Sequence, residues 1–146
     1  MEYLVGVILA LAVAGLATLI GLDRERSFYP TVLIVVASYY ALFAVMGASI
    51  SALEIESAFG AVFLALALLG FKRNMWLVAA AIAGHGVFDF AHDSLVDNPG
   101  VPVWWPGFCA TVDLILGAGW RFASGRLHTS TRVQRNRIGA NGSCVH

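Results

Sequence analysis

Five long apolar segments follow one another along this chain of 146 residues, and they constrain its fold more than any other feature. A helix of about 20 apolar residues crosses the ~30 Å hydrocarbon core of a membrane, and each segment is close to that length. The period-two alternation that is typical of membrane β-barrels is absent. The sequence therefore predicts an all-α integral membrane bundle of five transmembrane helices, over Tyr3–Leu22, Tyr29–Gly47, Ala52–Phe71, Met75–Val96 and Val103–Ala123.

The composition agrees with a membrane location. The chain is 59% hydrophobic and 12% charged, whereas about a quarter of the residues in an average soluble domain are charged. We therefore expect a multi-pass protein of the cell membrane, specifically a bacterial inner membrane. Membrane lipids are its expected partners, a homo-oligomer is compatible with the sequence, and no nucleic-acid partner is expected.

The basic residues predict the orientation of the helices. All of them follow the first and third segments or lie at or beyond the end of the fifth. Because Lys and Arg concentrate in cytoplasmic loops, this pattern predicts an N-terminus outside the cell and a C-terminus in the cytoplasm. The nine residues are Arg24, Arg26, Lys72, Arg73, Arg121, Arg126, Arg132, Arg135 and Arg137.

The chain divides into one domain and a tail. Residues 1–123 are expected to form the five-helix transmembrane domain. Residues 124–146 are polar, glycine-rich and basic, with too little apolar content to fold alone. We expect them to form a flexible cytoplasmic tail.

The stretch HGVFDFAHDSLVD, residues 85–97, places two histidines and three aspartates in an otherwise apolar segment. At 100° per residue, His85, Asp89 and His92 fall within about 60° of one another, and Asp93 extends this stripe. One face of the fourth helix is therefore polar. Asp93 and Asp97 lie near its outer end, where simple solvation explains them.

Acidic residues of two other helices are expected at the same depth. Glu54 and Glu56 begin the third helix and point in opposite directions, so only one of them should face the fourth helix. Asp113 lies roughly 15 Å along the fifth helix by helical rise. The sequence thus predicts a cavity open toward the outer leaflet, lined by His85, Asp89, His92, Asp113 and one of the two glutamates.

These groups suggest a metal site. A charge at the centre of a membrane helix costs about 2.5–3.5 kcal/mol on insertion scales, and such residues are functional by default. No Lys or Arg lies at this depth to neutralise the carboxylates. Imidazoles and carboxylates are ligands of divalent transition metals, and zinc or iron suits two histidines better than magnesium. The candidate metal ligands are His85, His92, Asp89, Asp113, Glu54 and Glu56.

Two resemblances accompany this interpretation. HGVFDFAHD, followed by NPGVPVWWPGFCATVD and preceded by GLDRERSFYP, resembles small bacterial integral-membrane proteins of unknown function, over most of the chain up to about residue 123. A looser similarity links the chain to multispanning membrane hydrolases of the alkaline-ceramidase type, whose histidines and aspartate hold a zinc ion inside the bundle. That group has seven spans and three histidine ligands, whereas this chain has five predicted spans and two intramembrane histidines.

Three functions are compatible with the sequence. The first is a metal-dependent hydrolase, in which the metal makes a bound water more acidic and Asp89 or Asp113 acts as general base on a lipid-like substrate. The second is a proton or metal-ion transporter that uses the same carboxylates. The third is a non-catalytic accessory protein whose polar residues only bond the helices together. Tyr39 and Tyr40, in the middle of the second helix, are expected to serve packing.

Overall fold

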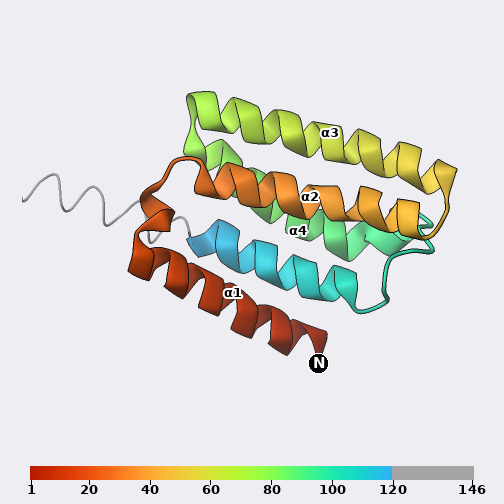
Figure 1. Ribbon diagram of the computed structural model, residues 1–146, viewed down its shortest axis with the longest axis horizontal. Coiled ribbons are helices and arrows are strands. Elements are labelled where there is room, and N and C mark those ends of the chain that lie inside the picture. Colours follow the sequence, from red (N-terminus) through yellow and green to blue (C-terminus); the bar gives the residue numbers. More distant parts are fainter. Residues whose placement is uncertain (120–146) are drawn as a thin grey trace, which may run out of the picture.

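The computed structural model describes residues 1–119, and this part of the chain is helical, without strands (Figure 1). The predicted all-α fold is therefore confirmed. A short 3₁₀ helix, η1 (Leu22–Arg24), follows the first helix. The long helices are α1 (Glu2–Ile20), α2 (Phe28–Met46), α3 (Ile50–Arg73), α4 (Met75–Leu95) and an unlabelled fifth helix over residues 105–119.

Four of these helices, α1 to α4, are long and apolar enough to cross a membrane. The fifth helix reaches the last described residue, so its predicted extent to Ala123 and the predicted tail over residues 124–146 lie outside the described residues. The fifth span and the orientation of the bundle therefore stay predictions.

Local signals set the breaks between helices. Gly21 ends α1 in the left-handed conformation, with φ 79°, which glycine adopts without steric penalty. The Ser49 hydroxyl accepts the Ala52 N–H and caps the start of α3. Asn74 is the C-cap residue of α3 and the N-cap residue of α4. Its side-chain oxygen accepts the Trp76 N–H. Such short connections make successive helices antiparallel.

The helices pack so that α2 lies between α3 and the fifth helix, with α4 behind it and α1 at the edge (Figure 1). Close approach of α1 to the fifth helix depends on Gly6, where a Cβ would lie 2.9 Å from the Phe108 carbonyl oxygen. An apolar core joins α2, α3, α4 and the fifth helix through residues such as Leu33, Ala67, Ile82 and Leu116.

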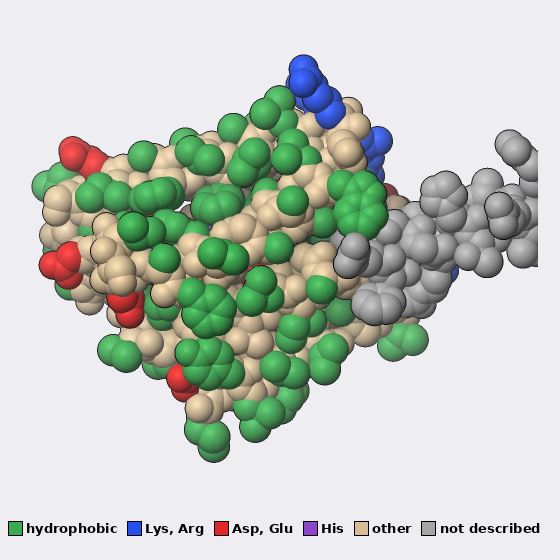
Figure 2. Space-filling view, turned by 180° about the vertical axis from the view of Figure 1, so that it is seen from behind, with side chains coloured by type: hydrophobic (Ala, Val, Ile, Leu, Met, Phe, Trp, Pro, Cys, Tyr) green, Lys and Arg blue, Asp and Glu red, His purple; other side chains and the backbone are tan. Residues whose placement is uncertain are grey.

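Exposed charges separate to the two ends of the bundle, except that exposed Glu25 lies among the basic residues. On the face in Figure 2, Lys and Arg lie at one end and acidic side chains gather at the other. The first, which we call the basic end, is where α1 and α3 end and α2 and α4 begin, and it carries Arg24, Arg26, Lys72 and Arg73. The opposite end, which we call the acidic end, carries exposed Glu54, Asp93 and Asp97.

Candidate metal centre

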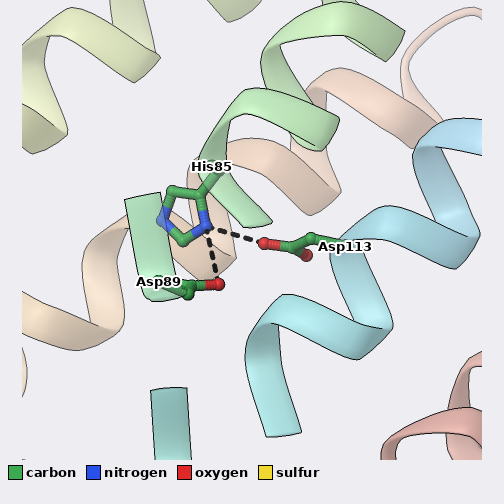
Figure 3. A group of neighbouring side chains, drawn as sticks. All are labelled: His85, Asp89 and Asp113. Carbon is green, nitrogen blue, oxygen red and sulfur yellow. Dashed lines mark hydrogen bonds and ion pairs between the residues drawn. The ribbon is translucent and has the colours of Figure 1, made fainter. Parts of the chain in front are cut away.

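Three side chains from two helices meet inside the bundle (Figure 3). His85 and Asp89 lie one turn apart on α4, and Asp113 comes from the fifth helix. His85 Nδ1 lies 2.7 Å from Asp113 Oδ2 and 3.5 Å from Asp89 Oδ2. One ligand atom from each residue lies within 4.8 Å of the others, and all three residues are at most 1% exposed. We call these residues the metal centre.

Two carboxylate oxygens of the metal centre have no hydrogen-bond partner. They are Asp89 Oδ2 and Asp113 Oδ1. The other oxygen of Asp89 accepts the Tyr40 hydroxyl at 2.8 Å. Because a buried unpaired oxygen costs about 1–3 kcal/mol, and more when it is charged, these two atoms are suited to a bound proton or cation.

A second polar group lies toward the acidic end. His92 Nε2 is 2.7 Å from Glu56 Oε1, and both side chains are 1% exposed. The Asn98 amide donates to the same glutamate oxygen at 3.0 Å and to the Tyr40 carbonyl at 3.1 Å. Glu56 Oε2 is buried without a hydrogen-bond partner. We call Glu56 and His92 the Glu56–His92 pair.

Tyr40 connects the two groups. Its hydroxyl bonds to Asp89 in the metal centre, while its ring stacks on His92 with centroids 4.0 Å apart and planes at 16°. This role differs from the packing role expected for Tyr39 and Tyr40. Tyr39 does pack, against Phe43 and Trp105.

The structure divides the residues that the sequence grouped as ligands. His85, Asp89 and Asp113 come together, whereas His92 and Glu56 form a pair of their own. Glu54 is exposed and lies outside both groups. Of the two glutamates, Glu56 is therefore the one that faces α4.

The expected cavity open toward the outer leaflet is not what the structure shows. The polar side chains of both groups are at most 1% exposed. Aromatic rings close around them: Phe63 packs on His85 at 4.7 Å between centroids, and Phe88 lies 5.7 Å from His92. Access to the metal centre therefore requires side chains to move.

The sequence did not indicate that Tyr40 and Asn98 contact the buried polar groups. Asn98 belongs to the segment NPG, whose residue types are typical of turns, and its side-chain oxygen does accept the Gly100 N–H in that way. Its amide nevertheless reaches the interior. Nothing in the sequence separates Tyr40 from Tyr39.

The charges of the buried groups do not balance. Glu56, Asp89 and Asp113 supply three carboxylates, and the only bases near them among residues 1–119 are two imidazoles. The Lys and Arg side chains of the described residues are all exposed at the basic end. Buried carboxylates repel one another unless protons or a cation lie among them, so the interior needs additional positive charge.

No family model, curated protein or solved structure matches this chain. The two resemblances stay expectations, and the geometry of the site is the basis on which a function can be inferred.

Proposed function

We propose that this protein is an integral membrane protein that binds one divalent transition metal ion at His85, Asp89 and Asp113. The observation that carries the proposal is the convergence of one imidazole and two carboxylates, with two oxygens unpartnered, in a completely buried place. A divalent ion would supply the positive charge that the described side chains lack.

The distances suit such an ion after small movements. Zinc binds nitrogen and oxygen ligands at about 2.0–2.2 Å in a tetrahedron, which puts the ligand atoms about 3.3 Å apart. The present separations from His85 Nδ1 are 2.7 Å and 3.5 Å. Replacing the shared proton by zinc would move His85 and Asp113 apart by less than 1 Å. Iron accepts the same ligand types.

Three protein ligands would leave one position of a tetrahedral ion open, as in catalytic zinc sites. We therefore propose metal-dependent hydrolysis as the reaction, with Asp89 or Asp113 taking the proton of the attacking water through an oxygen that does not hold the ion.

A groove beside the centre supports a lipid-like substrate. It has a volume of about 650 Å³, lies between α1, α2 and the fifth helix, and is almost entirely apolar. Cys109 and Val36 line the groove and are themselves buried. Cys109 precedes Asp113 by one turn of the fifth helix, so a residue that lines the groove shares a helix face with a residue of the metal centre. An acyl chain in the groove would lie against the helix that carries Asp113.

A role in proton or metal-ion transport has less support than hydrolysis. Toward the basic end, the described interior is mainly the apolar core that contains Leu33, Ala67 and Ile82, and Asp23 is its buried carboxylate. The polar side chains of the two groups all lie on the other side of this core. A site reached from one side fits this distribution better than a path through the bundle.

If the metal centre exists, the protein should bind metal in a one-to-one ratio. Protein purified in detergent, loaded with zinc and dialysed against metal-free buffer should retain about one ion per chain by elemental analysis. Occupancy should fall as the pH is lowered, because protons compete with the ion for the imidazole and carboxylate ligands. Substoichiometric metal after loading, at every pH tested, would favour the accessory role.

We further propose that the acidic end faces the outside and that the C-terminal tail is cytoplasmic, as the positive charges predict. In a Cys109→Ala background, a membrane-impermeant maleimide added to intact cells should leave Cys144 unlabelled until the membrane is permeabilised. Ser94→Cys, at an exposed position beside Asp93, should be labelled at once when Cys144 is also replaced by Ala. Labelling of Cys144 but not of Ser94→Cys in intact cells would mean that the orientation is the reverse of the one proposed.

A further inference from the structure

We propose that the Glu56–His92 pair is a proton-transfer site that exchanges protons with the acidic end of the bundle through Asp93. The site is distinct from the metal centre and does not need a metal to work.

The first observation is the position of the pair between the interior and the surface. His92 lies in the last turn of α4, and Glu56 lies about 9 Å by helical rise from the start of α3. The side chains of both are 1% exposed, whereas that of Asp93 is 75% exposed. Within one helical turn of α4, the environment thus changes from buried to solvated.

The second observation is that the two ring nitrogens of His92 face different carboxylates. Nε2 is 2.7 Å from Glu56 Oε1, on the buried side. Nδ1 is 3.5 Å from Asp93 Oδ1, on the exposed side. An imidazole takes a proton on one nitrogen and releases one from the other, which is why histidine serves as a proton shuttle.

The transfer balances within these three residues. A proton leaves the Asp93 carboxyl group, or water beside it, and forms an N–H bond at Nδ1. The N–H bond at Nε2 breaks, and its proton joins the Glu56 carboxylate. His92 is neutral before and after the step, and one proton has moved from the surface to the buried glutamate. The reverse sequence returns it.

The third observation is the unpartnered Oε2 of Glu56. Its Oε1 accepts from both His92 and Asn98, whereas Oε2 is buried without a hydrogen bond. An ionised carboxylate is poorly stabilised in that position. Protonation of Glu56 removes the charge, so this residue is suited to store the proton that His92 delivers.

The other neighbours of His92 and Glu56 do not offer a path for protons, so Asp93 is the proposed route to the surface. Tyr40 contacts His92 by ring stacking, with its hydroxyl bonded to Asp89, and Phe88 contacts His92 edge-on. Asn98 touches Glu56 but carries no titratable proton. Neither the stack nor the edge contact is a hydrogen bond, so the pair exchanges protons separately from the metal centre.

Nitrogen NMR of the histidine rings tests the proposal, with full-length metal-free protein in lipid nanodiscs. The measurement is the rate at which the His92 ring N–H exchanges with solvent, with its signal assigned from the His92→Gln spectrum. Asp93→Asn should slow this exchange on the order of 100-fold, which is the lower end of the usual contribution of a positioned acid or base. Asp97→Asn is the matched control, since it removes an exposed carboxylate of the same end, and it should leave the rate unchanged.

Equal rates in the parent and Asp93→Asn would overturn the proposal, and so would equal slowing by Asp97→Asn. Because Asp93 is exposed, its variant is not expected to lose the fold, and an unchanged circular dichroism spectrum checks this. Metal is absent from the measurement, so failure here leaves the metal centre untouched. Failure to bind metal likewise leaves this proposal standing.

Discussion

Replacing His85 by alanine should abolish stoichiometric metal binding. The variant removes the only nitrogen ligand of the metal centre and leaves Asp89 and Asp113 facing each other without a base between them. Asp113→Asn should have a similarly large effect. Tyr40→Phe keeps the ring against His92 but frees Asp89 Oδ1, and such a loss of support around a ligand lowers metal affinity about 10- to 100-fold. Competition with a chelating dye measures these affinities.

Tyr39→Phe is the matched control for Tyr40→Phe. Tyr39 contacts Phe43 and Trp105 through its ring, so the loss of its hydroxyl should leave metal affinity unchanged. If the polar residues only bond helices together, the parent should bind no metal. Each variant should then lose only about 0.6 kcal/mol, as is typical of a hydrogen bond between membrane helices. That result would reject the metal centre.

Gly100→Ala should destabilise the acidic end of the bundle severely. A Cβ at this position would overlap the Phe43 carbonyl oxygen, and it would lie 2.7 Å from the carbonyl carbon and 2.9 Å from Gly47 N. These are backbone atoms at the end of α2, so no side-chain rotation relieves the overlap. We expect a loss at or above the upper end of the ~1–3 kcal/mol that overpacking usually costs. The thermal unfolding midpoint in detergent measures it.

Gly84→Ala provides the comparison. A Cβ there meets nothing within 4 Å, and the position is exposed on α4 next to His85. Alanine favours a helix over glycine by about 1 kcal/mol, so this variant should be at least as stable as the parent. Similar midpoints for the two variants would show that Gly100 does not pack against the end of α2.

The part of the site that could be predicted follows from helix geometry. His85 and Asp89 share a face because they are four residues apart, and helical rise sets the depth of Asp113. His92 is on the same face, but it lies about 10 Å further along α4 than His85. The angle between residues around a helix does not include this axial distance, and for that reason the structure has two groups where one site was predicted.

The remaining features depend on how each helix is rotated in the bundle. Tyr39 and Tyr40 are adjacent and differ by 100° around α2, so only packing against α4 decides which of them reaches Asp89. The choice between Glu54 and Glu56 is of the same kind. The sequence also did not predict that Phe63 and Phe88 would cover the polar groups. Apolar residues beside a polar stripe are compatible both with a packed interior and with a lipid-facing surface.

The single residue between α3 and α4 fixes the register of these two helices. Glu56 lies 18 residues before Asn74 (74 − 56) and His92 lies 18 residues after it (92 − 74). The two side chains are therefore both about 27 Å of helical rise from the connection, at equal depth. One residue inserted beside Asn74 would shift one helix by about 1.5 Å and rotate it by about 100°. The contact between Glu56 and His92 is thus set at the opposite end of the hairpin, where neither residue is found.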